Sequence, residues 1–461
     1  MSFDQLDSQR VRRFQRKVTL LSAGGTFLDG FDLTIVAVAL PSVIKQWQLG
    51  AGTASMVVSS AIIGSFIGAV WLGRLTDRFG RKAMYVVDLL AFVLFAALTA
   101  VSQSAWQLIL FRFLLGVGIG ADYPISATLV AEFSSRHKRG QHGTFLAAMW
   151  FVGAVAAYVV GLASLPMGEN AWRYMLGVGA VFALIVFFFR MTLPESPRWL
   201  QSKGRHDEAE AVMLAVTGEK IVLARETQSE GSLAQLFSKS LRRRTVFVLG
   251  FWFCYATAYY GISMYAPTII SPFSHGSRVL TIIGSGAIAI LGMLGAIIGM
   301  NLVDRWGRRP LIITSFAGLS LALLVLALNA KPTFAFLVVL FSCAVLFANS
   351  GGGILNFVYP TELFPTNVRA GASGLATSVS RIGSILGVLV FPNFVAWWGA
   401  STALWFFFGV ALAGLLISVW LAPETRNKSL EQLSTLEGDA GLAAAGSGLN
   451  DAVETASMAR R

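Results

Sequence analysis

The chain has 461 residues, of which 55% are hydrophobic and only 13% are charged, and its mean hydropathy is +0.66. Soluble globular domains carry about twice that charged fraction, so the composition excludes an ordinary soluble enzyme or binding domain. The formal net charge of +12 would fit a nucleic-acid-binding protein. The basic residues, however, flank long apolar runs and are rare inside them. This distribution argues against a nucleic-acid-binding protein.

A helix needs roughly 20 apolar residues to cross a bilayer, and about twelve such runs occur, in two groups of six. In chain order they cover residues 18–43, 53–73, 83–102, 106–130, 142–164, 172–192, 246–270, 279–303, 311–329, 333–357, 371–395 and 401–421. The sequence therefore predicts an all-α, polytopic membrane protein with twelve transmembrane helices.

The positions of the basic residues predict the orientation of these helices. Most of the 36 lysine and arginine residues lie on one side, and only Lys45, Arg173, Arg278 and Lys331 fall in loops of the other side. Basic loops stay in the cytoplasm. The predicted organisation is a cytoplasmic N-terminus (1–17), an N-terminal bundle (18–192), a cytoplasmic linker (193–245), a C-terminal bundle (246–421) and a cytoplasmic tail (422–461).

Two carboxylates interrupt the first run. Asp29 and Asp32 are three residues apart, so a helix presents both on one face. A carboxylate in hydrocarbon costs several kcal/mol unless it faces a polar interior. An inert pair near a helix end is the alternative, but Asp29 lies well inside the run, and a functional role is therefore predicted.

The fourth run carries an arginine and an acid. Arg112 is followed at helical spacing by Gly116 and Gly120, a small-residue stripe that lets helices approach closely. Asp122 lies about 15 Å further along the helix and on a different face from Arg112. A packing hydrogen bond is the alternative, but we predict that Asp122 contacts substrate together with the neighbouring Tyr123.

The second half keeps fewer intramembrane charges. Arg381 lies about ten residues from either end of its run, too deep to reach water, and a buried cation there calls for a carboxylate partner. Tyr255 and Tyr259 share one face of the seventh run, and Asn356 lies near the end of the tenth. We predict that these residues bind substrate, although packing explains the tyrosines about as well.

A polar, basic loop occurs twice, once in each half. Gly73–Lys82 and Asn301–Arg309 are closely similar, and acidic and basic residues after spans four, six, ten and twelve also occupy matching places in the two halves. The duplication predicts a cytoplasmic gate that locks the bundles together when the binding site faces outward. Its predicted members are Gly73, Asp77, Arg78, Gly80, Arg81, Glu132, Arg139, Glu195, Arg198, Asp304, Arg305, Gly307, Arg308, Glu362, Arg369 and Glu424.

These motifs together resemble a known superfamily. Gly73–Lys82 resembles the loop 2–3 signature of the major facilitator superfamily, and Pro194–Leu200, Arg112 with its glycines and Pro423–Arg426 resemble the sugar porter motifs. Asp29-Gly-Phe-Asp32 resembles the first-span motif of aromatic-acid:proton symporters, and Gly120–Pro124 is similar to bacterial phosphate and metabolite:proton symporters. The resemblance implies two pseudo-symmetric six-helix bundles that rock around a central site.

Proton coupling needs a titratable group inside the bundle. All four histidines lie in loops or the linker, so aspartates are the candidates. We expect Asp32 or Asp29 to pair with Arg112 when ionised and to release it when protonated, and the resemblance implies the same coupling unit. The polar amides that sugar porters carry in span seven are absent, and Tyr255 and its neighbours occupy that region.

The predicted function is proton symport of a small organic metabolite, a carboxylate or aromatic acid, into the cytoplasm. The expected partners are this substrate, a proton and the lipid bilayer of the inner membrane, with no nucleic acid, no metal, no cofactor and no second copy. A sugar or polyol symporter is the main alternative. A drug or metabolite antiporter and a transporter-like nutrient sensor are further alternatives, and an enzyme is not expected because no nucleophile–base pair appears.

Overall fold

The computed structural model describes residues 9–133, 139–218, 232–329 and 332–426, and all regular structure within these ranges is helical. The N-terminal helices are α1 (Gln9–Trp47), α2 (Ala51–Phe79), α3 (Arg81–Ala100), α4 (Ala105–Phe133), α5 (Arg139–Ser164), η2 (Leu165–Asn170) and α6 (Ala171–Arg190). The linker holds α7 (Pro197–Ser202), α8 (His206–Thr217) and η3 (Leu233–Phe237). The C-terminal helices are α9 (Arg242–Ser263), α10 (Ala266–Ile270), η4 (Ser271–Phe273), α11 (Arg278–Trp306), α12 (Arg308–Leu328), α13 (Phe334–Ser350), α14 (Gly352–Leu363), α15 (Thr366–Trp398) and α16 (Ala400–Leu421).

Each of the twelve predicted spans overlaps a long helix or a pair of consecutive helices in the described ranges. Within the described residues, ten segments are long and apolar enough to cross a membrane, one of which, Phe145–Arg190, covers most of α5 and all of α6. In α4 the apolar part is the shorter segment Ala105–Gly120. Helices are the expected solution because an apolar span must satisfy its backbone hydrogen bonds internally.

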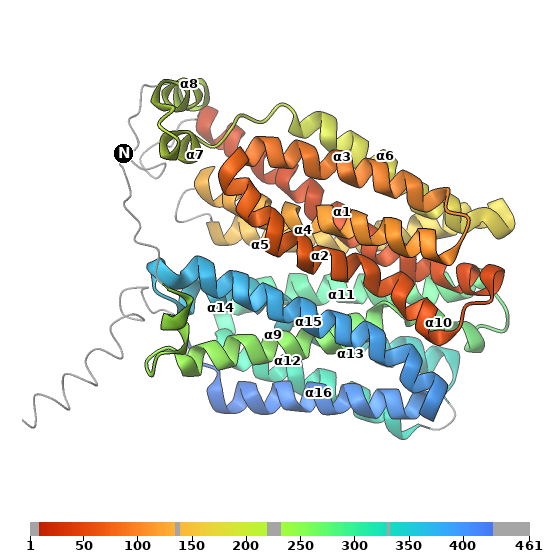
Figure 1. Cartoon of the computed structure of the whole chain (residues 1–461). Helices are drawn as coiled ribbons and strands as arrows, with labels where there is room; N and C mark the ends of the chain where they lie inside the picture. Colours follow the sequence, from red (N-terminus) through yellow and green to blue (C-terminus); the bar gives the residue numbers. More distant parts are fainter. Residues whose placement is uncertain (1–8, 134–138, 219–231, 330–331, 427–461) are drawn as a thin grey trace, which may run out of the picture.

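The helices form two groups that lie side by side along a common axis (Figure 1). In the N-terminal group α2 packs on α4, α1 packs on α5 and α6, and α3 packs on α6. In the C-terminal group α9 packs on α15 and α16, α11 packs on α13, and α12 packs on α16. The halves meet where α15 contacts α2, α5 contacts α11 and α1 contacts α10. We call the end of the groups that carries α7 and α8 the linker end.

Close helix contact depends on glycine at the interface of α2 and α4. A Cβ atom on Gly116 would lie 2.1 Å from the carbonyl oxygen of Ala61, and one on Gly120 would lie 2.2 Å from that of Ser65. Because no side chain fits there, the small-residue stripe predicted on the fourth run is the surface on which α2 rests.

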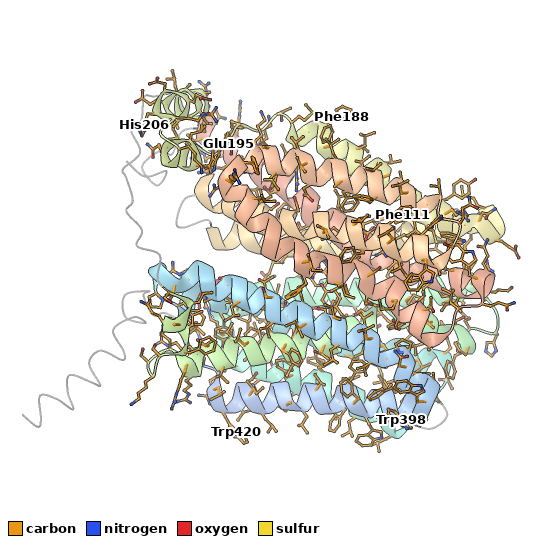
Figure 2. All side chains as sticks on the ribbon, in the orientation of Figure 1. Phe111, Phe188, Glu195, His206, Trp398 and Trp420 are labelled. Carbon is orange, nitrogen blue, oxygen red and sulfur yellow. The ribbon has the colours of Figure 1, made fainter. Side chains whose placement is uncertain are left out.

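The outer surface of the groups is apolar, as lipid contact requires. Phe188, Trp398 and Trp420 point outward from α6, α15 and α16 (Figure 2) and are at least 60% exposed. Large exposed apolar side chains occur along most of the long helices. A surface of this kind is typical of a protein embedded in hydrocarbon.

The first helix is longer than the predicted span. It begins at Gln9, nine residues before residue 18, and its basic start reaches the linker. There Arg10 donates a hydrogen bond of 2.9 Å from Nη2 to the carbonyl oxygen of Ala215 in α8. The helix α1 therefore connects the linker helices directly to the interior of the N-terminal group.

The tenth predicted span is broken into α13 and α14 at Gly351. The hydroxyl of Ser315 on α12 donates to the carbonyl oxygen of Phe347 at 2.6 Å and accepts from the backbone N–H of Gly352 at 3.1 Å. Three consecutive glycines weaken the helix, and a side chain from a neighbouring helix satisfies the backbone groups at the break.

Candidate functional site

Asp32 and Arg112 form an ion pair in the interior of the N-terminal group. Arg112 Nη2 on α4 lies 3.1 Å from Asp32 Oδ2 on α1, and the Arg112 side chain is 0% exposed. The Nε and Nη1 atoms of Arg112 have no hydrogen-bond partner among the described residues. The structure thus brings together two of the three residues predicted to couple protons, and it selects Asp32 over Asp29 as the partner of Arg112.

Asp29 lies on the same helix and is also buried. Its carboxylate is within electrostatic range of Asp32, of Asp122, of Arg190 and of Arg381 on α15. A cation of the C-terminal group, Arg381, therefore acts on an acid of the N-terminal group.

Asp122 is engaged by an arginine that was not among the predicted site residues. Arg190, the last residue of α6, is 3% exposed. Its Nη1 and Nη2 atoms donate to the two carboxylate oxygens of Asp122, and its Nε donates to the carbonyl oxygen of Leu21 at 3.0 Å. Although Arg190 ends its helix, its side chain lies between the helices of the N-terminal group.

The same cluster contains an acid that the sequence analysis missed. Asp88 on α3 is 3% exposed, and its Oδ1 atom has no hydrogen-bond partner among the described residues. It lies within hydrogen-bonding range of Asp122. The signal was present, because Asp88 is a carboxylate within the third apolar run and follows Tyr85 by three residues.

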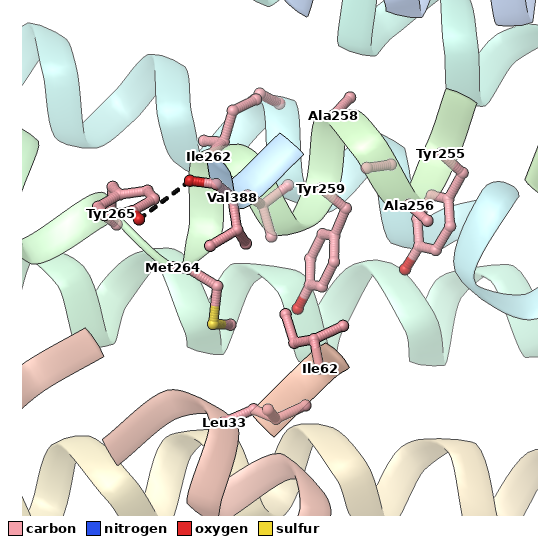
Figure 3. Close-up of a cluster of buried hydrophobic side chains, with 14 of the residues drawn as sticks. Leu33, Ile62, Tyr255, Ala256, Ala258, Tyr259, Ile262, Met264, Tyr265 and Val388 are labelled. Carbon is pink, nitrogen blue, oxygen red and sulfur yellow. Dashed lines mark hydrogen bonds between the residues drawn. The ribbon is translucent and has the colours of Figure 1, made fainter. Parts of the chain in front are cut away.

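An aromatic cluster joins the two halves. The rings of Tyr255 and Tyr259 stack with centroids 5.5 Å apart, and Tyr260 meets Tyr259 edge-on at 5.4 Å. From the N-terminal half, Trp150 on α5 packs on Tyr259 at 6.0 Å and on Tyr260 at 6.3 Å. Figure 3 shows Tyr255 and Tyr259 projecting from α9 toward the side on which Leu33 lies. The predicted tyrosine face is therefore directed at the other half.

Polar groups border this aromatic cluster. The guanidinium of Arg381 lies close to the hydroxyl of Tyr260, and the hydroxyl of Tyr255 donates to Asn349 Oδ1 at 2.8 Å. Asn349 Nδ2 and Asn356 Oδ1 are buried and have no partner among the described residues. The structure thus gathers Arg381, the tyrosines and a buried amide pair, of which Asn349 was not among the predicted site residues.

The loop between α2 and α3 receives a carboxylate from the linker. Glu195, labelled in Figure 2, accepts backbone N–H bonds from Arg81 at 3.0 Å and from Lys82 at 3.1 Å. Gly80 has a φ of 105°, and a Cβ atom there would lie 2.4 Å from Glu195 Oε2, so both conformation and contact require glycine. Arg78 is exposed beside the ring of Phe79. The surroundings of Gly73 and the side chains of Asp77, Tyr123, Glu132, Arg139 and Arg198 lie outside the described part of the structure.

The second loop repeats this arrangement with Glu424. Its carboxylate accepts backbone N–H bonds from Arg308 at 3.1 Å and Arg309 at 3.0 Å, and Gly307 has a φ of 98°. Burial acts to raise the pKa of Glu424, but N–H bonds from Arg426, Arg309 and Arg308 outweigh it and hold this pKa below its ordinary value.

The remaining residues predicted for the second-half gate lie around Arg308. Its guanidinium pairs with Glu362 at 2.8 Å and with the exposed Asp304 at 3.0 Å. Arg369 donates to the carbonyl oxygen of Phe364 at 3.1 Å, and Arg305 is exposed. Each of these contacts at the two loops lies within one half of the chain.

Comparisons with known proteins agree with this architecture. Residues 17–436 match the model of the family described as "Sugar (and other) transporter". YaaU of Escherichia coli strain K12, which is named for metabolite transport, is 36% identical over 93% of this chain and 97% of its own length. The niacin transporter NiaP of Acinetobacter baylyi is 29% identical over 93% of this chain and 98% of its own length.

The fold is also found in a solved structure. The chain superposes on the partially occluded, inward-open xylose transporter XylE of Escherichia coli with a TM-score of 0.75, over 90% of this chain and 100% of XylE. The two sequences are 20% identical, so this likeness concerns the fold. The predicted major facilitator fold is confirmed, and the matched relatives are transporters, not enzymes. This chain belongs to the sugar (and other) transporter family of the major facilitator superfamily and is a multi-pass membrane transporter of sugars or metabolites.

Proposed function

We propose that this protein is a proton-coupled symporter that takes up a small organic carboxylate by alternating access. The observation that carries this proposal is the environment of Arg381. Within the described residues Arg381 forms no salt bridge, although it lies deep within α15 between the two halves. A cation at that depth needs an anionic partner; Asp29 acts on Arg381 without a direct salt bridge, and a substrate carboxylate would supply the direct contact.

The groups around Arg381 fit the remainder of an aromatic acid. Tyr255, Tyr259, Tyr260 and Trp150 present ring faces and edges at the junction of the halves, and aromatic pairs favour such offset and edge-on contacts. The unpartnered amide atoms of Asn349 and Asn356 offer one donor and one acceptor. Niacin, which the relative NiaP is named for transporting, is an aromatic carboxylic acid of this kind.

Proton coupling is assigned to Asp32 and Arg112. Removing one partner of a buried ion pair leaves an uncompensated charge, which costs about 3–5 kcal/mol. Protonation of Asp32 neutralises one partner, so Arg112 must then find a new acceptor, and its unpartnered Nε and Nη1 atoms are free to bind one. The change of partner would bias the two bundles toward a different arrangement.

The proposed setting is the inner membrane, with both termini in the cytoplasm, because the linker end carries most of the basic residues and basic loops stay in the cytoplasm. The linker end would then be the cytoplasmic face, and the paired loops at Glu195 and Glu424 would form the cytoplasmic gate. We propose a monomer that uses a proton as coupling ion and no cofactor.

The first test concerns the substrate class. Purified protein in proteoliposomes would be assayed for uptake of an aromatic acid such as niacin and of a neutral sugar such as xylose. A charge-assisted hydrogen bond contributes about 1.5–3 kcal/mol, so Arg381→Gln should raise the apparent Km for the acid by roughly ten- to hundredfold. Arg278→Gln, at the exposed start of α11, is the matched control. An unchanged Km for the acid in Arg381→Gln would refute the assignment.

The second test concerns coupling. Asp32→Asn keeps the shape of the side chain but cannot be ionised, so uptake driven by a proton gradient should be lost while counterflow exchange continues. Asp207→Asn on the exposed linker helix α8 is the control and should behave like the unmodified protein. Full uphill uptake by Asp32→Asn would exclude Asp32 as the proton carrier.

A sugar or polyol symporter is the second candidate, favoured by the family description and by the likeness to a proton:xylose symporter. Uptake of xylose but not of niacin, unaffected by Arg381→Gln, would support it. An antiporter would use the same residues in the opposite direction and would acidify the vesicle lumen as substrate leaves. A nutrient sensor would bind substrate without transporting it.

A further inference from the structure

The interior of the N-terminal half contains a second charged cluster, which the proposed coupling unit does not use. It consists of Asp88 on α3, Asp122 on α4 and Arg190 on α6, and we call it the inner acid cluster. The Arg190 guanidinium bonds both oxygens of Asp122 and packs 4.1 Å from the ring centroid of Tyr85. The hydroxyl of Ser126 donates to Asp122 Oδ2 at 3.3 Å.

The two carboxyl groups of this cluster face each other. A Cβ atom on Gly118 of α4 would lie 3.2 Å from Asp88 Oδ1, and Asp122 follows Gly118 by one helical turn on the same face of α4. The carboxyl groups are within hydrogen-bonding range. Both residues are 3% exposed, and Asp88 Oδ1 has no partner among the described residues.

The charges of the cluster do not balance if both acids are ionised. Arg190 is always protonated and its positive charge neutralises one carboxylate, so a second carboxylate would leave a buried negative charge. Two carboxyl groups in such proximity cannot both ionise, and they share one proton instead. The other groups that act on the pair are Asp29 from α1 and Tyr85 from α3, and they add no positive charge.

We propose that Asp88 and Asp122 hold one proton between them and form the relay through which the coupled proton leaves Asp29 toward the linker end. The relay function rests on the proposed proton symport, whereas the shared proton does not. In the transfer Asp32 passes the coupled proton to Asp29, the O–H bond of protonated Asp29 then breaks as an oxygen of the pair gains that proton, and the pair releases the proton it held to water at the linker end.

The geometry of α1 connects Asp29 to this pair. A Cβ atom on Gly25 would lie 1.8 Å from Asp122 Oδ2 and 2.1 Å from Arg190 Nη2, so Asp122 touches α1 at Gly25. Asp29 follows Gly25 by four residues and therefore lies one turn, about 6 Å, further from the linker end on the same face. Asp32, paired with Arg112, is a further turn away. The acids thus form a series along one face of α1.

The shared proton can be tested without any substrate. Infrared spectra of the purified protein in lipid at neutral pH would record the carbonyl stretch of protonated carboxyl groups, identified by its shift in heavy water. Asp88→Asn should remove the intensity of one protonated acid, because the remaining Asp122 ionises against Arg190. Asp207→Asn should leave the spectrum unchanged. If Asp88→Asn retains the full intensity of the unmodified protein, the pair holds no proton and the proposal is refuted.

The relay is tested by transport. General acid–base groups contribute about a hundredfold or more to proton-transfer rates, so Asp88→Asn should slow gradient-driven uptake by about a hundredfold and leave counterflow exchange unaffected. Uptake at the unmodified rate would exclude the relay. Loss of both gradient-driven uptake and counterflow exchange would also exclude the relay, because Asp88 would then serve substrate binding or folding. Asp88→Glu, which restores a carboxyl group, should recover gradient-driven uptake. If no carboxylate is transported but the infrared band is lost in Asp88→Asn, the shared proton stands and the proposed function fails.

Discussion

The contact between α1 and α5 offers a direct test of how the charged helix is positioned. Gly30 lies between Asp29 and Asp32 on α1, and a Cβ atom there would lie 1.9 Å from the carbonyl oxygen of Trp150. On the other side of the contact, a Cβ atom on Gly153 would lie 2.1 Å from the carbonyl oxygen of Phe27. The two backbones therefore touch directly, and Gly30→Ala must separate them.

The size of the effect follows from these distances. A carbon atom does not approach an oxygen closer than about 3 Å, so Gly30→Ala requires a shift of roughly 1 Å between two helix backbones. Overpacking costs about 1–3 kcal/mol where side chains can adjust. Here the clash is with a carbonyl oxygen, which cannot rotate away. We therefore expect the free energy of unfolding to fall by about 3 kcal/mol, the upper end of that range. For a domain of 150–250 residues this corresponds to a fall of roughly 6–12 °C in Tm.

The assay is a thermal scan of purified protein in detergent, combined with gradient-driven uptake, since displacement of α1 also moves Asp29 and Asp32. Gly374→Ala is the matched control because it lies within α15 and a Cβ atom there meets nothing within 4 Å. Alanine favours helix over glycine by about 1 kcal/mol, so the control should be as stable as the unmodified protein or slightly more so. Equal Tm values for Gly30→Ala and Gly374→Ala would refute the described contact.

Two further predictions concern the C-terminal half. The depressed pKa of Glu424 means that its carboxylate stabilises the fold above its ordinary pKa and that this contribution is lost as the pH falls through the folded-state value. Glu424→Gln should therefore lower Tm at neutral pH, and the difference from the unmodified protein should close below pH 4.5; a difference that persists in acid would contradict this. Ser315→Ala removes the hydrogen bonds at the break between α13 and α14 and should lower the free energy of unfolding by about 1–3 kcal/mol. This loss would be measured as a fall in Tm. No fall is expected for Ser378→Ala, whose hydroxyl bonds only within its own helix.

The positions of the helices could be predicted because lipid permits few alternatives. An apolar run of about 20 residues must be helical in hydrocarbon, so the twelve spans follow from hydropathy and length alone. The break at Gly351 coincides with three consecutive glycines, Gly351–Gly353. The start of α1 at Gln9 was not predicted, because a polar helix outside the membrane is stabilised by contacts such as that of Arg10 with α8, which hydropathy does not detect.

The pairing of the buried charges could be predicted only in part. Asp29 and Asp32 lie about 60° apart around α1, so either could meet Arg112 until the rotation of α1 against α4 is known. Arg190 was not predicted as a site residue because it lies near the end of an apolar run, and its inward position depends on Asp122 of another helix. The spacing of residues along one helix cannot reveal which neighbouring helix supplies a partner.

The length of α1 has a practical consequence. Because one continuous helix carries Asp29 and Asp32 and also holds α8 through Arg10, a displacement of the N-terminal half is transmitted to α8. The short helix η3 contacts α9 and α15 and so follows the C-terminal half. A pair of fluorescent or spin labels, one on α8 and one on η3, would thus measure the separation of the halves from positions remote from every residue assigned to binding or coupling.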